Sequence, residues 1–226
     1  MKNILVFIAH QDDETIGCGG TLRKFYEMGH NVIVSFVTDG STGIDQSQEI
    51  GTETIVDTRL KESQRACKIL GVTKIEQMKL RCQDVENSQK NFHKFIRLIR
   101  KYQPDIIITH YEKDKHRDHR ATYEIVSEAS WKASENIHAE LGPPHKVGDV
   151  WCCEVTDLID KPDIYVDITG CFDKKMEALT EYSSQSYVTG GIIDFLDGIS
   201  KVRGFYAGVS RAEAFKSVSP FGRLYS

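Results

Sequence analysis

The sequence contains no long apolar run and no surplus of positive charge. Its longest clean apolar run, Ile4–Ala9, is far shorter than the ~20 residues that a membrane-spanning helix requires. A polar segment follows this run at once, with no small-residue cleavage site, so we expect neither a transmembrane segment nor a signal peptide. Lys and Arg number 29 against 33 Asp and Glu, a net charge of −4. This balance argues against a nucleic-acid partner held by a broad basic face.

Paired-cysteine motifs and two common catalytic or cofactor signatures are also missing. The six cysteines form no C-x-x-C pair, which favours free thiols in a reducing cytoplasm over a disulfide framework or a zinc knuckle. No G-x-S-x-G segment occurs, which argues against a serine hydrolase. Gly17–Gly20 matches part of the dinucleotide-binding motif G-x-G-x-x-G, but Leu22 stands where the last glycine is required. Close packing of a helix on a strand explains these glycines better.

The remaining composition is that of an ordinary globular protein. With 226 residues, 40% hydrophobic and 27% charged, the chain is long enough to bury a core without disulfides. We expect one domain that spans residues 1–226.

Strand-like runs alternate with helical segments along most of the chain. The strands are expected at Asn3–Ala9, Asn31–Thr38, Lys74–Leu80, Asp105–Thr109, Val147–Val155 and Asp163–Ile168. The helices are expected at Gly17–Met28, Asp57–Leu70, Ser88–Tyr102, Asp118–Ile137 and Phe172–Tyr182. We expect a long loop over Thr42–Ile55 and assign no element from Ser183 onward. The alternation predicts an α/β fold, a Rossmann-like three-layer sandwich whose mostly parallel sheet is covered by helices on both faces.

Polar residues gather where two of these strands end, which is where parallel sheets bind their ligands. His10-Gln11-Asp12-Asp13-Glu14 follows the first strand. Imidazole and carboxylate are common ligands of zinc and other divalent ions, and His10 and Asp13 could both reach one ion. Asp12, beside them, could serve as a general base. The alternative is a polar turn in which an Asp caps the helix that follows.

A second polar cluster, His116-Arg117-Asp118-His119, comes after the strand at Asp105–Thr109. Two histidines three residues apart, where a loop meets a helix, can present both rings to one site. For this segment alone, a solvated charged loop is the alternative. Together the two clusters offer more than the three protein ligands that a catalytic zinc ion requires. We therefore predict a metal site.

Both clusters resemble motifs of the zinc-dependent N-deacetylases of the LmbE-like or PIG-L type, which act on N-acetylglucosaminyl compounds. The family's first motif, A-H-P-D-D-E-x-x-G-x-G-G, corresponds to Ala9–Gly20, and its H-P-D-H corresponds to His116–His119. Weaker matches lie at Arg59-x-x-Glu62, Lys175–Leu179 and Glu213-x-Phe215. The resemblance spans most of the chain.

The resemblance implies a cofactor and a substrate class. His10, Asp13 and His119 would hold Zn²⁺, although Fe²⁺ or Co²⁺ could occupy the same ligands. The implied reaction removes the acetyl group from an N-acetylated amino sugar of the N-acetylglucosamine type, or from its conjugate. Self-association is frequent among relatives, so a homo-oligomer stays open.

The resemblance also implies catalytic roles. Asp12 would take a proton from the attacking water. His116, held by Asp118, would stabilise the tetrahedral intermediate and protonate the leaving amine. Arg59 would contact the sugar or acid group of the substrate, with a plain helix-surface charge as the alternative.

Three residues depart from the family pattern. Gln11 and Arg117 replace the two motif prolines, and Lys115 stands where many members have an aromatic residue. Neither proline is a ligand, so the metal site should survive, although the turn loses a residue with a fixed φ. Two other functions stay open: a metal-dependent amidase or phosphoesterase acting on another small conjugate, and a non-catalytic Rossmann-like binding module.

Overall fold

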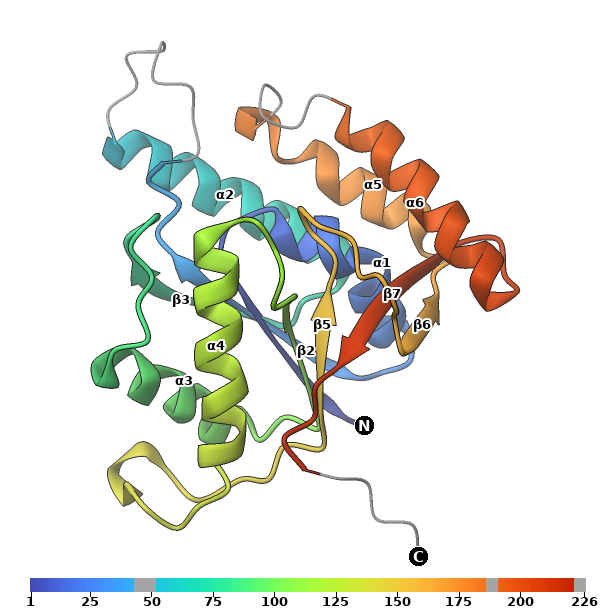
Figure 1. The fold of residues 1–226 in the computed structure, drawn as a ribbon. Coiled ribbons are helices and arrows are strands. Elements are labelled where there is room, and N and C mark those ends of the chain that lie inside the picture. The colour runs from blue at the N-terminus through green and yellow to red at the C-terminus, as the bar shows by residue number, and fades with distance from the viewer. Residues whose placement is uncertain (43–51, 186–190, 222–226) are drawn as a thin grey trace, which may run out of the picture.

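Seven strands form one mixed sheet in the part of the protein that its structure, a computed structural model, describes: residues 1–42, 52–185 and 191–221 (Figure 1). The strands are β1 (Asn3–Ile8), β2 (Asn31–Thr38), β3 (Lys74–Leu80), β4 (Ile106–His110), β5 (Asp149–Cys153), β6 (Ile164–Asp167) and β7 (Ala212–Ser217). Their order is β3-β2-β1-β4-β5-β7-β6. The first five strands are parallel, and β7 runs antiparallel to both β5 and β6. The expected mostly parallel sheet is confirmed.

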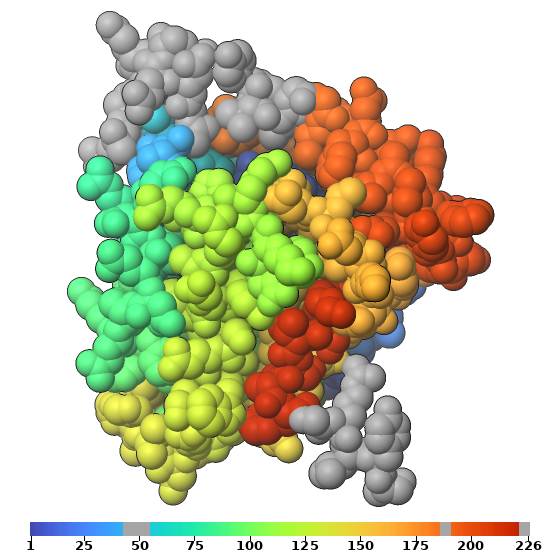
Figure 2. All heavy atoms as spheres, in the orientation of Figure 1, coloured from blue at the N-terminus to red at the C-terminus, as the bar shows by residue number. Residues whose placement is uncertain are grey.

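Helices cover both faces of the sheet. They are α1 (Asp13–Glu27), α2 (Thr52–Leu70), α3 (Gln89–Tyr102), α4 (Arg117–Lys132), α5 (Phe172–Thr180) and α6 (Ile192–Ala207). Alternate residues of β1 enter two separate cores: Ile4 and Val6 pack with α1, α2, α5 and α6, whereas Leu5 and Phe7 pack with α3 and α4. The α3 and α4 layer fills much of the near face, between teal and yellow-green (Figure 2). The three-layer prediction is therefore confirmed.

The glycines after β1 serve close packing, as expected. A Cβ added at Gly17 would lie 2.8 Å from Cys153 Sγ, and one at Gly20 would lie 2.9 Å from Ile168 side-chain atoms. Only a residue without a side chain lets α1 approach the neighbouring elements this closely.

Several predicted boundaries are wrong. The helix expected from Gly17 begins at Asp13, because the polar run after β1 already forms its first turn. The helix expected to reach Ile137 ends at Lys132. In the expected loop over Thr42–Ile55, residues 43–51 lie outside the described part, and α2 already begins at Thr52. Two elements, α6 and β7, lie in the segment to which no element was assigned.

The state of the cysteines and the character of the helices bear on two of the expectations drawn from the sequence. All six cysteines are free and buried, as expected. No helix in the described ranges has the length and apolar character needed to cross a membrane.

Arg100 organises the segment that follows α4. Its guanidinium is buried and donates hydrogen bonds of 2.7–3.1 Å to backbone carbonyls. The acceptors are the carbonyl oxygens of Ala133, Glu135, Ile137, His138 and Gly142. Because these carbonyls bond to a side chain instead of continuing the helix, α4 ends earlier than its sequence suggests.

We predict that Arg100→Met destabilises the protein by about 3 kcal/mol or more, since five backbone carbonyls would lose the donor that Arg100 supplies. Urea unfolding of the purified variant measures this loss. Arg97→Met is the matched control, because Arg97 is exposed and makes one bond, to Glu140 O. A similar loss in both variants would show that Arg100 does not have this role.

Candidate metal centre

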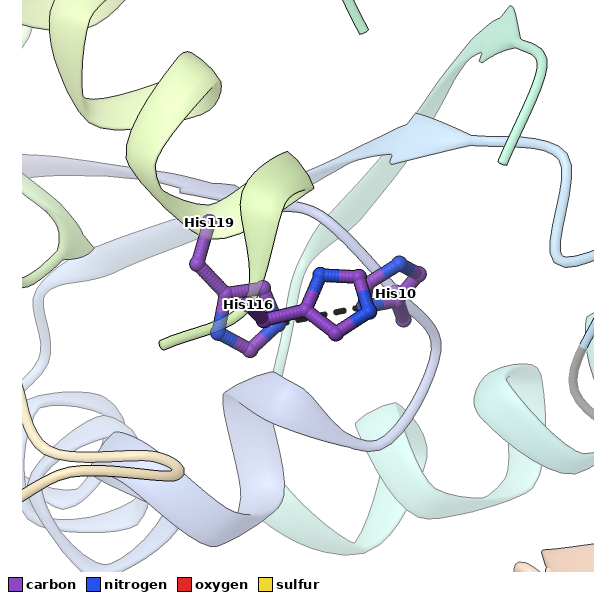
Figure 3. A group of neighbouring side chains, drawn as sticks. All are labelled: His10, His116 and His119. Atoms are coloured by element: carbon purple, nitrogen blue, oxygen red, sulfur yellow. Dashed lines mark hydrogen bonds between the residues drawn. The ribbon is translucent and has the colours of Figure 1, made fainter. Parts of the chain in front are cut away.

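Two loops bring the predicted site residues together at one edge of the sheet. His10, Asp12 and Asp13 follow β1, while His116 and His119 lie at the start of α4, after the neighbouring strand β4. The rings of His10, His116 and His119 converge (Figure 3). Segments about a hundred residues apart in the sequence thus form one cluster.

Three of the predicted ligand atoms form an equilateral triangle. His10 Nδ1, Asp13 Oδ2 and His119 Nε2 lie 3.2 Å from one another along all three edges. Zinc–ligand bonds of about 2.0–2.1 Å in a tetrahedral arrangement place neighbouring ligands roughly 3.3 Å apart. The triangle therefore fits one face of a tetrahedral zinc site.

Carboxylates on the far side of both rings fix the orientation of these nitrogens. His10 Nε2 lies 3.1 Å from Asp118 Oδ2, and His119 Nδ1 lies 3.1 Å from Asp114 Oδ2. A proton on each outer nitrogen leaves the inner nitrogen with its lone pair toward the centre, as in metal-binding histidines. Two lone pairs and the Asp13 carboxylate then face one point, where a cation stabilises all three.

The electrostatics of the cluster favour positive charge. Burial lowers the pKa of each ring, but the neighbouring carboxylates together outweigh it: Asp13 and Asp118 raise the pKa of His10 to about 9, and Asp13 and Asp114 raise that of His119 to about 10. Burial also opposes ionisation of Asp13, yet the two rings hold the pKa of this carboxyl well below its usual range.

His110, the last residue of β4, packs against the cluster. Its ring is fully buried and stacks on His119, with ring centroids 3.8 Å apart. Its Nε2 lies 3.5 Å from Asp13 Oδ2 but accepts a hydrogen bond of 2.8 Å from the Ala9 N–H, so this lone pair is already engaged. Burial holds the pKa of His110 well below its usual value. A neutral ring that packs against His119 is the result.

His116 occupies the N-cap position of α4 at the half-buried rim of the site. Its Nδ1 accepts a hydrogen bond of 3.2 Å from the Asp118 N–H, and its Nε2 lies 3.4 Å from the Gln83 side-chain amide. We expected Asp118 to hold His116, and the contact indeed exists, but through the backbone. The Asp118 carboxylate instead contacts His10 and accepts from the Gln83 N–H at 2.8 Å.

Asp12 adopts an unusual backbone conformation beside the triangle. Its φ is 124°, and although it stands at the N-cap of α1, its side chain makes no capping bond. Such strain costs on the order of 1–3 kcal/mol and persists only where surrounding contacts impose it. Burial raises the pKa of Asp12 to about 7, against the opposing effect of Arg59. The capping interpretation of this residue is therefore wrong.

Arg59 lies under this turn. It is 3% exposed, its Nη2 donates to Gln11 O at 2.7 Å, and the same atom lies 3.6 Å from Asp12 Oδ2. A plain surface charge, the alternative considered from the sequence, is excluded. Its polar contacts are with the turn that carries the Asp12 carboxylate and, through Nη1, with Gly40 O at 3.4 Å.

Gln11 ties the same turn to β2. Its side chain is buried, and Nε2 donates to Thr38 O at 3.2 Å. The loss of the motif proline is thus accompanied by a new anchor for the turn. Arg117, the other replacement, is exposed in the first turn of α4.

Sequence analysis missed two acidic residues that support the site. Asp114 faces His119 and accepts from the His116 N–H at 2.8 Å. It lies in a run of alternating charges, so nothing in the sequence distinguished it from the charged residues beside it. Glu14 is fully buried and accepts from the Asp12 N–H at 3.1 Å and from the Tyr182 hydroxyl. Its place within the motif was a usable signal, whereas Asp114 had only its position between His110 and His116.

Comparison with protein families identifies the chain. A family model described as PIG-L: GlcNAc-PI de-N-acetylase matches residues 5–130, more than half of the sequence and the part that contains the triangle. The chain belongs to this family. The resemblance noted from the two motifs is therefore confirmed.

Individual members of the PIG-L family show what the chain is similar to. It is 29% identical over 194 residues to a diacetylchitobiose deacetylase from Thermococcus kodakarensis, covering 82% of this chain and 70% of the relative. The solved structure of an N,N′-diacetylchitobiose deacetylase from Pyrococcus horikoshii matches with a TM-score of 0.87 and 26% identity, over 97% of this chain and 87% of the other.

A third relative carries a different name. A 4-oxalmesaconate hydratase from Pseudomonas putida is 26% identical over 199 residues, covering 83% of this chain and 75% of the relative. Members at this level of similarity thus carry the names of two different reactions, and a test of this protein must separate them.

We predict that Asp114→Asn weakens zinc binding about 10- to 100-fold, because it removes the charged partner of His119. Competition with a chromogenic chelator measures the affinity. Asp157→Asn is the control: Asp157 holds the same loop by accepting from the Lys115 N–H at 2.7 Å, and no contact with a triangle residue is seen for it. Equal affinities for Asp114→Asn and the parent protein would contradict the role of Asp114.

We also predict that zinc uptake by the metal-free protein near pH 8 releases at least one proton, since His10 and His119 with pKa values of about 9 and about 10 must lose theirs to bind. Titration calorimetry in buffers of different ionisation enthalpy counts the protons. Protonation of these rings stabilises the metal-free fold fully below pH ~6.5, and this contribution is lost as the pH rises through about 9 to 10. Proton-neutral zinc binding would rule this out.

Proposed function

We propose that this protein is a zinc-dependent deacetylase that hydrolyses the N-acetyl group of an N-acetylated amino sugar of the N-acetylglucosamine type, or of its conjugate. The observation that carries the proposal is the 3.2 Å triangle of His10, Asp13 and His119, with the Asp12 carboxyl group next to it. Family membership and the deacetylase names of its relatives support the same reaction.

In this proposal His10, Asp13 and His119 hold the metal ion. When bound, zinc supplies Lewis-acid activation of the acetamide carbonyl and of a water molecule. Two imidazoles and one carboxylate suit Zn²⁺, and Fe²⁺ or Co²⁺ can use the same donors. Asp118 and Asp114 keep both rings turned so that the ligand nitrogens face the centre.

Asp12 is the general base in this scheme. A pKa of about 7 lies close to neutral pH, where a carboxyl group is both partly ionised and able to keep the proton it receives. Arg59 favours the ionised form, and its bond to Gln11 O fixes the turn. Direct contact between Arg59 and the substrate stays a prediction, and the geometry supports a role through Asp12.

His116 is the general acid. Because its Nδ1 accepts from the Asp118 N–H, the proton of the neutral ring resides on Nε2. This atom lies at the rim of the site beside Gln83, where the neutral ring can donate a hydrogen bond to the tetrahedral intermediate. Transfer of a proton to the leaving amine requires the imidazolium form of His116. Burial and the neighbouring rings of His10 and His119 lower the pKa of His116, so this form gives up its proton readily.

Six free thiols fit a reducing compartment, so we place this reaction in the cytoplasm. The substrate is a small molecule in this proposal.

The decisive assay measures acetate release from N-acetylglucosamine, its glycosides and N,N′-diacetylchitobiose. We expect release by the zinc-loaded protein, loss after chelation and recovery when zinc is restored. Metal-dependent release of phosphate instead of acetate would favour the phosphoesterase alternative. Conversion of an unsaturated acid without acetate release would place the protein with the hydratase relative, and full ligand binding without metal would favour a binding module.

We predict that Asp12→Asn lowers kcat for acetate release by about 10²- to 10⁴-fold, the usual contribution of a positioned base, while zinc content stays at the level of the parent protein. Steady-state kinetics and metal analysis on the same preparation measure both quantities. Asp157→Asn, with no observed contact to the triangle, should keep full activity. An active Asp12→Asn enzyme would remove Asp12 from the mechanism.

A further inference from the structure

Helix α1 is broken one turn after the metal site. Cys18 has φ −149° and ψ 16°, far from helical values, and the segment before it carries Asp13 and Glu14. In an unbroken helix, the Gly20 N–H would donate to the carbonyl oxygen of Ile16, four residues earlier. The break opens this bond and leaves both groups in need of partners inside the protein.

Two charged side chains from distant elements fill the break. The Gly20 N–H donates to Glu213 Oε1 at 3.0 Å, and the Thr21 N–H donates to Oε2 at 2.7 Å. On the other side, Lys175 Nζ donates to Ile16 O at 2.8 Å and to Glu213 Oε1 at 2.6 Å. The ion pair between α5 and β7 thus contacts both the donor and the acceptor that this backbone hydrogen bond would join. Side chains inserted into the helical ladder are an established cause of helix kinks.

This ion pair is buried, with Lys175 3% and Glu213 5% exposed. Removal of one partner from a buried pair leaves an uncompensated charge, so the two residues depend on each other. Both lie outside the cluster of metal-ligating side chains and contact α1 behind it.

The break lies close enough to Asp13 for the Lys175–Glu213 ion pair to affect the geometry of the metal site. Asp13 lies about 7 Å along the helix axis from Cys18, so a change of roughly 20° at the break would displace Asp13 by some 2–3 Å. The edges of the ligand triangle are 3.2 Å long. A displacement of that size removes Asp13 Oδ2 from the triangle.

We propose that Lys175 and Glu213 are positioning residues of the metal centre: their ion pair holds α1 open at Cys18 and thereby sets Asp13 at ligand distance from His10 and His119. The inference rests on the metal site of the proposed function, although it does not depend on which bond the enzyme cleaves. Neither residue touches the reacting atoms.

The test compares zinc affinity with stability in purified variants. Lys175→Met and Glu213→Gln each break the pair, and Lys175→Met/Glu213→Leu removes both charges and lets the Gly20 N–H bond to Ile16 O. Arg100→Met is the control, because it removes a buried charge on α3, which covers the opposite face of the sheet from the break in α1. Zn²⁺ affinity comes from chelator competition, ligand geometry from the visible spectrum of the Co²⁺-loaded protein, and stability from thermal melting.

We expect the double variant to melt above both single variants, yet to bind zinc at least tenfold more weakly than the parent protein and to show an altered Co²⁺ spectrum. The control should lose stability while it keeps affinity and spectrum. Zinc affinity within twofold of the parent in the double variant, with an unchanged spectrum, would overturn the inference. If that variant does not fold, Lys175→Met against Arg100→Met decides by the same criteria.

The outcome also separates this inference from the proposed reaction. Tight zinc binding that weakens in the variants, without acetate release by the parent protein, would refute the reaction and support the positioning role. Failure of the parent protein to bind zinc would overturn the metal centre and this inference together.

Discussion

The charge of one buried carboxylate organises the whole site. Asp13 faces two imidazoles whose outer nitrogens are themselves held by Asp118 and Asp114. Three carboxylates and two imidazole rings that are buried together are stable only when positive charge lies among them. Protons on the rings or a bound metal ion supply this charge. The strained turn at Asp12, the buried Arg59 below it and the break in α1 all serve to keep this carboxylate in place.

Short-range sequence patterns predicted much of the sheet and the three residues of the triangle. Continuous apolar runs marked the central strands, and two compact motifs named His10, Asp13 and His119, which the fold brings within 3.2 Å of one another. The start of α1 could not be predicted, because the polar first turn of this helix has no apolar periodicity. Helix α6 was hidden because Phe205 is 81% exposed while Leu196 is buried, so its apolar residues face two sides.

Contacts between segments that lie far apart in the sequence could not be predicted from local patterns. Asp118 was expected to hold His116, but its carboxylate contacts His10 and only its backbone N–H contacts His116. The fold alone decides between these two neighbouring rings. Arg59 has the spacing of any charged helix residue, yet it lies buried under the turn that follows β1. Local sequence motifs identify the candidate site residues, whereas tertiary packing determines which side chain orients which.

The late position of β7 has a consequence for synthesis of the protein. This strand enters the sheet between β5 and β6 and carries Glu213, which accepts from the Gly20 and Thr21 N–H groups near the start of the chain. A nascent chain that has left the ribosome only as far as α5 already contains both motifs and every residue of the triangle, but not the Glu213 carboxylate. Segments in α1 and β7 must therefore meet before α1 has its final shape, and a fragment that carries the complete motifs but lacks β7 is still an unfinished site.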